Sequence, residues 1–154
     1  MMHGAVEGIG YLVGTWRGEG RGVYPTIDSF AYTEELTFCH PDPRKPVLTY
    51  SQRTWNPITS LPMHSESGFW RPKLDGSLEV VLAQSTGLVE VQKGTFDADQ
   101  KVICLKSDLV GNASKVKDIT RVFKLVDGEL SYVVEMATAL TSLQPHLKAV
   151  LRKV

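Results

Sequence analysis

Residues 116–139, VKDITRVFKLVDGELSYVVEMATA, decide the fold class of this chain. Large apolar residues occupy alternate positions on both sides of an Asp-Gly pair at 127–128, as Leu130, Tyr132 and Val134 illustrate. A period of two is typical of a β-strand with one face on a core and the other toward water. An Asp-Gly pair between two such runs is a strong hairpin signal because both residues tolerate positive φ. The stretch therefore predicts two antiparallel strands joined by a tight turn.

The same alternation recurs along the rest of the chain. Residues 77–84 repeat it, and the second Asp-Gly pair, at 75–76, predicts another tight hairpin turn before them. Proline-containing segments at 41–46 and 56–62 predict longer loops, because proline removes a donor from the strand ladder. We expect ten strands, near residues 15–24, 30–39, 46–55, 63–71, 77–84, 87–96, 101–108, 116–126, 129–139 and 146–153.

Many antiparallel strands at this spacing predict an all-β sandwich or barrel. We favour the barrel, because closure leaves no unpaired edge strand. A barrel of eight or more strands also has room for side chains or one small ligand. The only helix-like stretch is short, at residues 6–12, and the length of 154 residues suits one domain. We therefore predict a single domain over residues 1–154, a ten-stranded antiparallel β-barrel with a short N-terminal helix.

The charge balance excludes some classes of partner. Seventeen basic and seventeen acidic residues cancel, so the chain lacks the basic surface that nucleic-acid binding uses. No apolar run approaches the ~20 residues that span a bilayer, and the N-terminus does not have the pattern of a signal peptide. Cys39 and Cys104 have no metal-type spacing, which favours two reduced thiols. We expect a cytoplasmic protein that binds neither nucleic acid nor membrane, and the sequence leaves its oligomeric state open.

The glycine-rich stretch at 14–22 could be mistaken for a phosphate-binding loop. A dinucleotide site needs a strand before the glycines and a helix after them, whereas here the helix-like stretch comes first. We interpret 14–22 as the start of the first strand, with Gly18, Gly20 and Gly22 on the same face as Trp16. Glycine at these positions allows a bend and a close approach of the backbone. Trp16 is then expected to plug the closed end of the barrel.

Histidine is the residue type with most functional promise. No pair of histidines has a zinc-site spacing. His146 is the best placed, because Gln144-Pro145 fixes the loop before it and the predicted last strand begins there, at a barrel rim. A lone histidine at the mouth of an apolar cavity is the arrangement that haem iron needs. Strict alternation sets His146 on the face opposite Leu147, so either it precedes the regular pleating or the strand is irregular.

Two further residues have alternative interpretations. Arg121 shares a strand face with Ile119 and Phe123, and if it points into the barrel it needs a polar partner there. A bulge that turns it outward is the alternative. Met136 lies on the apolar face of its strand, where methionine is most often flexible core filler.

Segments along nearly the whole chain resemble the nitrobindin family. They occur in the family's order and with compatible spacing. The matching segments are GTWRGEG at 14–20, YPT at 24–26, PMHSESG at 62–68, AQSTGLVEV at 83–91, MAT at 136–138 and QPHL at 144–147.

The resemblance implies a barrel of the fatty-acid-binding-protein type that binds haem b in a shallow, solvent-facing site at its mouth. It implies that His146 is the ligand of a ferric iron and the catalytic centre, and that Thr26 contacts the haem. It also implies binding of nitric oxide and isomerisation of peroxynitrite to nitrate, in which the metal acts as Lewis acid and template. From their strand faces, we expect four further residues in the cavity: Met63 and His64 near its opening, and Gln84 and Met136 deeper inside.

Two other functions remain as alternatives. The same cavity could serve a non-enzymatic carrier of a fatty-acid-like or other small hydrophobic ligand, and fold alone does not separate carrier from enzyme. An interaction module with an unused cavity is the third possibility, and its mark would be an exposed apolar patch.

Overall fold

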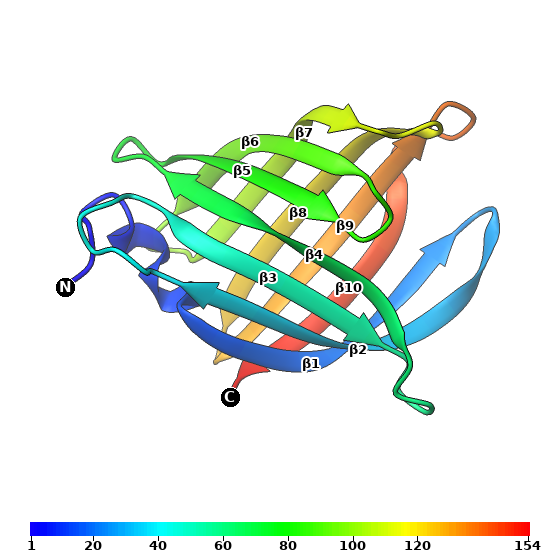
Figure 1. Ribbon diagram of the computed structural model, residues 1–154, viewed down its shortest axis with the longest axis horizontal. Helices are drawn as coiled ribbons and strands as arrows, with labels where there is room; N and C mark the ends of the chain where they lie inside the picture. Colours follow the sequence, from blue (N-terminus) through cyan, green and yellow to red (C-terminus); the bar gives the residue numbers. More distant parts are fainter.

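The computed structural model describes residues 1–154 as a closed antiparallel barrel of ten strands (Figure 1). Each strand pairs with the next one along the chain, and the first pairs with the last, so no edge strand remains. The predicted all-β barrel is confirmed. Its elements are η1 (Glu7–Leu12), β1 (Gly14–Tyr24), β2 (Ile27–Cys39), β3 (Leu48–Trp55), β4 (Pro62–Pro72), β5 (Ser77–Gln84), β6 (Val89–Asp97), β7 (Val102–Gly111), β8 (Val116–Val126), β9 (Glu129–Thr138) and β10 (Gln144–Lys153).

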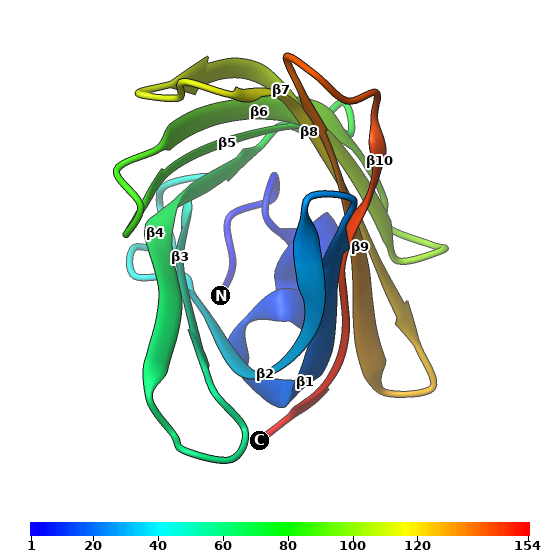
Figure 2. The same cartoon turned by 90° about the vertical axis from the view of Figure 1, so that its right-hand side faces the viewer.

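The up-and-down strand order gives the barrel two different ends. The connections β1–β2, β3–β4, β5–β6, β7–β8 and β9–β10 gather at one end, on the right of Figure 1, which we call the mouth. The single helix, η1, lies at the opposite end, which we call the closed end. Figure 2 looks into the barrel from the mouth and shows η1 behind the strands, within the outline of the barrel.

Apolar packing holds η1 across the closed end. Val6, Ile9 and Leu12 are fully buried. The Trp16 side chain is 2% exposed and donates its Nε1–H to the Leu12 carbonyl oxygen at 2.8 Å. The prediction that Trp16 plugs this end is therefore confirmed. η1 is a 3₁₀-helix, and the structure contains no helix with the length and hydropathy that a membrane crossing requires.

One of the inward-facing glycines of β1 makes room for an aromatic ring. Gly20 pairs with Tyr32 of β2, and a Cβ atom at Gly20 would lie 2.3 Å from Cζ of that tyrosine. A separation that short is impossible, so the Tyr32 ring depends on glycine at position 20 to lie over β1.

The two Asp-Gly pairs form different turns. Asp127 and Gly128 both have positive φ, 52° and 78°, as predicted for a two-residue hairpin. At 75–76 only Gly76 has positive φ, and the N–H of Lys73 donates to the carbonyl oxygen of Ser77. That pair is therefore the second half of a four-residue loop, which corrects the expectation of a tight turn there.

The interior changes character along the barrel axis. Near the closed end, four aromatic rings, those of Phe38, Tyr50, Trp70 and Phe123, pack against one another with centroid separations of 5.1–5.7 Å. Toward the mouth, the inward-facing side chains leave a cavity. The candidate site lies there.

Candidate functional site

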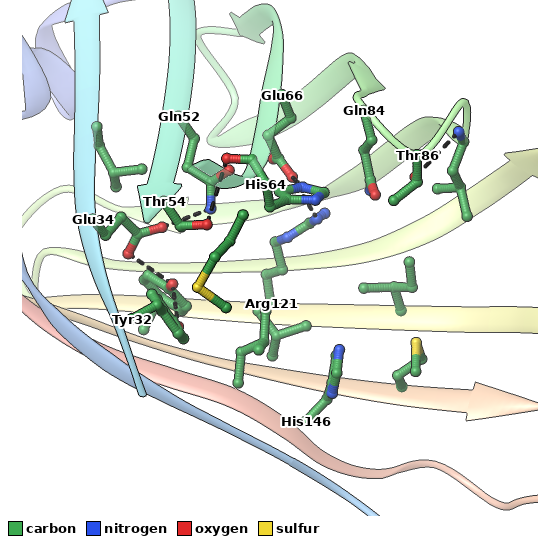
Figure 3. Close-up of a pocket in the computed structure, with 18 of the residues that line it drawn as sticks. Tyr32, Glu34, Gln52, Thr54, His64, Glu66, Gln84, Thr86, Arg121 and His146 are labelled. Atoms are coloured by element: carbon green, nitrogen blue, oxygen red, sulfur yellow. Dashed lines mark hydrogen bonds and ion pairs between the residues drawn. The ribbon is translucent and has the colours of Figure 1, made fainter. Parts of the chain in front are cut away.

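A cavity of about 440 Å³ extends from the mouth into the barrel as far as the Tyr50 and Phe123 rings. Side chains from β2, β3, β4, β5, β8, β9 and β10 line it (Figure 3). The lining is mixed: 13 of its 22 residues are hydrophobic, and most of the remainder belong to hydrogen-bonded polar networks. A cavity of this size and composition is typical of a small-molecule site.

A β-bulge brings His146 into this cavity. Pro145 pairs with Glu135 of β9 and Leu147 pairs with Val134, so His146 is the extra residue between them. Two consecutive residues of β10, His146 and Leu147, therefore both line the cavity. The second of the two interpretations left open by the sequence is correct, because the strand is irregular at this point.

Two contacts hold the His146 ring. Its Nδ1 lies 3.0 Å from the carbonyl oxygen of Val23, and since a carbonyl can only accept, Nδ1 carries the proton and Nε2 keeps its lone pair. The ring of Tyr24 packs edge-on against the imidazole at a centroid separation of 5.5 Å. Burial of the ring is the main reason that the pKa of His146 lies below its ordinary value. The imidazole is thus neutral at neutral pH, the form that coordinates metal ions.

On the opposite wall, β4 presents a second histidine. Figure 3 shows His64 across the cavity from His146. Its Nε2 lies 3.1 Å from Oε1 of Glu66, and the same carboxylate accepts a hydrogen bond from Tyr50 at 3.1 Å. Glu66 is buried, and although burial raises its pKa, the charge of Arg121 and the contact with His64 hold it below the ordinary value. This carboxylate is therefore ionised and keeps His64 in one orientation.

Arg121 points into the barrel and has partners there. Its two terminal nitrogens donate to the two oxygens of Glu90, at 3.2 and 3.0 Å. A Glu66 oxygen lies 3.8 Å from the same guanidinium. The alternative of an outward-turning bulge is wrong, and the interior partner expected for an inward Arg121 is Glu90. Gln84 also donates to this carboxylate, from its Nε2 to Glu90 Oε2 at 2.5 Å.

A second polar network surrounds Glu34 of β2, which is fully buried. One carboxylate oxygen accepts from the Tyr132 hydroxyl at 2.7 Å, and the other accepts from Gln52 Nε2 at 2.7 Å. The Tyr32 and Tyr132 hydroxyls are 2.7 Å apart. Burial outweighs the two hydrogen bonds and raises the pKa of Glu34 to about 7.

Comparison with known proteins agrees with this geometry. The family description "THAP4-like, heme-binding beta-barrel domain" matches residues 5–153. The Arabidopsis thaliana protein named peroxynitrite isomerase Rv2717c is 62% identical over 152 residues, which cover 99% of this chain and 90% of that protein. Peroxynitrite isomerase 1 of Mycobacterium tuberculosis is 38% identical over 157 residues, which cover 97% of this chain and 94% of that protein. The crystal structure of Rv2717c from M. tuberculosis has a TM-score of 0.89 at 36% identity, and covers 100% of this chain and 99% of that one.

The chain belongs to the nitrobindin family of haem-binding β-barrels. The residues at the mouth suit such a cofactor. His146 offers a neutral nitrogen with a free lone pair, and its other nitrogen is oriented by a carbonyl, as is usual for metal-binding histidines. Apolar side chains beside it, including Phe30, Met136 and Leu147, provide surface for a macrocycle.

The structure brings together all but one of the residues that the sequence predicts for the nitrobindin site. His146, His64, Met63, Met136 and Gln84 all line the cavity. The expected depth of two of them is wrong: Gln84 is the last residue of β5 and Met136 pairs with Gln144, so both lie at the mouth ends of their strands and not deeper inside. Thr26 does not line the cavity: it is exposed in the turn between β1 and β2. A haem contact at Thr26 would therefore lie outside the cavity, and its role stays a prediction.

Sequence reasoning missed the interior carboxylates. Glu34, Glu66 and Glu90 all lie on the inner face, and each is at most 7% exposed. The available signal was their position in the alternation: Glu34, for example, stands two residues from both Tyr32 and Leu36, which also face inward. Because glutamate is rarely buried, a strand face that carries a glutamate is normally interpreted as facing solvent. Only knowledge of its interior partners would change that interpretation.

Proposed function

We propose that this protein is a haem-dependent peroxynitrite isomerase, with ferric haem b held at the barrel mouth by His146. Nitric oxide is proposed as a second ligand of the same site. Membership of a haem-binding family and relatives that bear the name peroxynitrite isomerase support the proposal. The observation that carries it is the His146 imidazole, which a bulge places in the cavity and the Val23 carbonyl holds through Nδ1.

The side chains of the cavity have distinct tasks in this proposal. His146 would hold the haem iron through the lone pair of its Nε2. The apolar side chains near the mouth would pack against the macrocycle in a solvent-facing site. His64, which is held by Glu66, presents its imidazole to the cavity from the wall opposite His146. Bound haem would supply the Lewis-acid iron at which the O–O bond of peroxynitrite is weakened and the fragments recombine to nitrate.

The fatty-acid-carrier alternative lacks a partner for the carboxylate of its ligand. Arg121 is the only arginine or lysine in the cavity lining, and it already binds Glu90 and faces Glu66. A fatty-acid carboxylate would also meet Glu34 and Glu66. The charge arrangement therefore favours the haem enzyme over the carrier.

The decisive experiment is an absorption spectrum of the haem-reconstituted wild type beside the His146→Ala variant. We expect a ferric Soret band in the wild type and its loss or shift in the variant, together with the loss of peroxynitrite decay above the uncatalysed rate. His40→Ala is the matched control, because His40 is a half-buried loop histidine outside the cavity whose side chain bonds to the Lys45 carbonyl. Identical spectra for the wild type and His146→Ala would refute His146 as the iron ligand.

A further inference from the structure

The cavity continues inward beyond the proposed haem position. Strand register shows the depth: on β1, Gly22 pairs with both Leu147 and Phe30 near the mouth, whereas Gly18 pairs with Glu34. Glu34 therefore lies four residues along β2 from the level of the bulge, toward the closed end. Glu34, Tyr32 and Gln52 all line the cavity, so this inner region is continuous with the mouth (Figure 3).

The polar groups of this inner region have spare acceptors and few spare donors. Tyr132 gives its only hydroxyl proton to Glu34, so Tyr32 must donate to Tyr132, and the Tyr32 oxygen accepts no hydrogen bond within the protein. Each Glu34 oxygen accepts one hydrogen bond from the protein and has a second acceptor position left. Gln52 is 7% exposed, and its buried Oε1 has no partner at all. Only the second amide hydrogen of Gln52 is left as a donor.

The inner region also has a negative charge that no basic side chain balances. Arg121 forms a two-pronged ion pair with Glu90, and Glu66 lies between Arg121 and His64. Glu34, whose bonds go to a tyrosine and an amide, is the one cavity carboxylate without a basic partner. A buried carboxylate without a positive partner is costly, and a ligand that brings a positive charge would remove that cost.

We propose that the inner half of the cavity is a second binding site, separate from the haem position, for a small amphipathic amine whose ammonium group binds between Glu34, Gln52 and Tyr32. An ammonium group brings three donors and a positive charge, which matches the spare acceptors and the unpaired carboxylate. The apolar tail contacts Leu36 and Phe123, which also line the cavity.

The test compares three probes of equal chain length: hexylamine, hexanol and hexanoate. Their binding to the full chain is measured at pH 8, where Glu34 is ionised and hexylamine is charged, by isothermal titration calorimetry, once without haem and once after haem reconstitution. We expect hexylamine to bind about ten-fold or more tightly than hexanoate, with hexanol between them, because a hydrogen bond to a charged group contributes about 1.5–3 kcal/mol. The preference should hold in both preparations, since the site does not involve His146. Failure of haem binding would therefore not count against the amine site.

Two neighbouring glutamates supply the variant and its control. Glu34→Gln keeps the shape and the hydrogen bond from Tyr132 but removes the charge, so it should lower hexylamine affinity about ten-fold or more, to the level of hexanol. Glu35→Gln changes the adjacent residue, which lies on the outer face and binds Arg17 and Arg53, and it should leave hexylamine binding unchanged. Thermal melting confirms that both variants are folded. Absence of hexylamine binding at millimolar concentration, equal or tighter binding of hexanoate, or an unaltered affinity in Glu34→Gln would each overturn the proposal.

Discussion

At the scale of single residues, Glu34 and Glu35 show how strand alternation decides chemistry. Glu34 faces the barrel interior, where burial raises its pKa to about 7. Glu35, the next residue, faces outward and lies 2.7 Å from Arg17 and 2.8 Å from Arg53. Hydrogen bonds from these arginines hold the pKa of Glu35 below its ordinary value. Two identical side chains thus respond to pH in opposite directions.

This difference predicts opposite effects on stability. Between pH 4.5, the ordinary value, and about pH 7, folded Glu34 keeps a proton that the unfolded chain releases, so wild-type stability falls as pH rises through this window. Glu34→Gln removes that loss. Its free energy of unfolding should rise relative to the wild type by at most about 3 kcal/mol between pH 4.5 and 7.

Glu35→Gln is expected to show the reverse sign. The lowered folded pKa of Glu35 gives the wild type stability that is present above the ordinary value and lost as pH falls through the folded pKa. The Glu35→Gln variant lacks this contribution, so its free energy of unfolding should be lower than that of the wild type at neutral pH. The difference should become smaller as the pH falls. Urea unfolding curves of the wild type and both variants, recorded from pH 3.5 to 8, measure both effects. Parallel pH profiles for the two variants would contradict the assignment.

At the scale of elements, the bulge in β10 is the feature that makes the site. If β10 were regular, the position before Leu147 would pair with Glu135 and face outward, because Val134 faces inward. A histidine at position 146 is therefore not enough to place an imidazole in the cavity. The extra residue between Gln144 and Leu147 is equally necessary.

Deletion of Pro145 tests this directly. With one residue fewer, His146 is expected to pair with Glu135 and turn outward, although the histidine itself is retained. Haem binding, followed by the Soret band, should fall as far as it does in His146→Ala. Circular dichroism and thermal melting check that the barrel persists, and an unchanged Soret band in a folded variant would contradict the role given to the bulge.

Elements differ in how far the sequence predicts them. The strands and the Asp127-Gly128 turn follow from local rules, because alternation and positive φ are encoded by neighbouring residues. The inward orientation of His146 is not local: it results from the register of β10 against β9, which no single segment encodes. The interior ion pair of Arg121 and Glu90 likewise joins residues that are 31 positions apart.

At the scale of the whole molecule, the two ends of the barrel are structurally separate. Trp16 and η1 close one end (Figure 1), whereas His146 lies near the start of β10, at the mouth. Aromatic packing near the closed end supplies stability, and the polar cavity supplies the site. A change at the closed end should therefore affect unfolding without changing the chemistry of the mouth.

Trp16→Ala is expected to lower the free energy of unfolding by about 3–5 kcal/mol, the usual cost of truncating a fully buried tryptophan. The Soret maximum of the reconstituted variant should match that of the wild type under conditions where it is folded. Trp55→Ala serves as the comparison, because Trp55 ends β3 and is only half-buried, and its loss should be smaller. Urea titration gives the energies, and a shifted Soret maximum in Trp16→Ala would show that the two ends are coupled.

The bulge has a consequence for the way such a site is gained or lost in evolution. Because one surplus residue between Gln144 and Leu147 turns His146 inward, a three-nucleotide deletion there would remove the ligand while every strand kept its pairing. A substitution at the outward-turned position could not restore it. Among relatives of this chain, the spacing of this short segment should therefore distinguish barrels that keep an inward histidine from those that have lost it, even where the histidine codon survives.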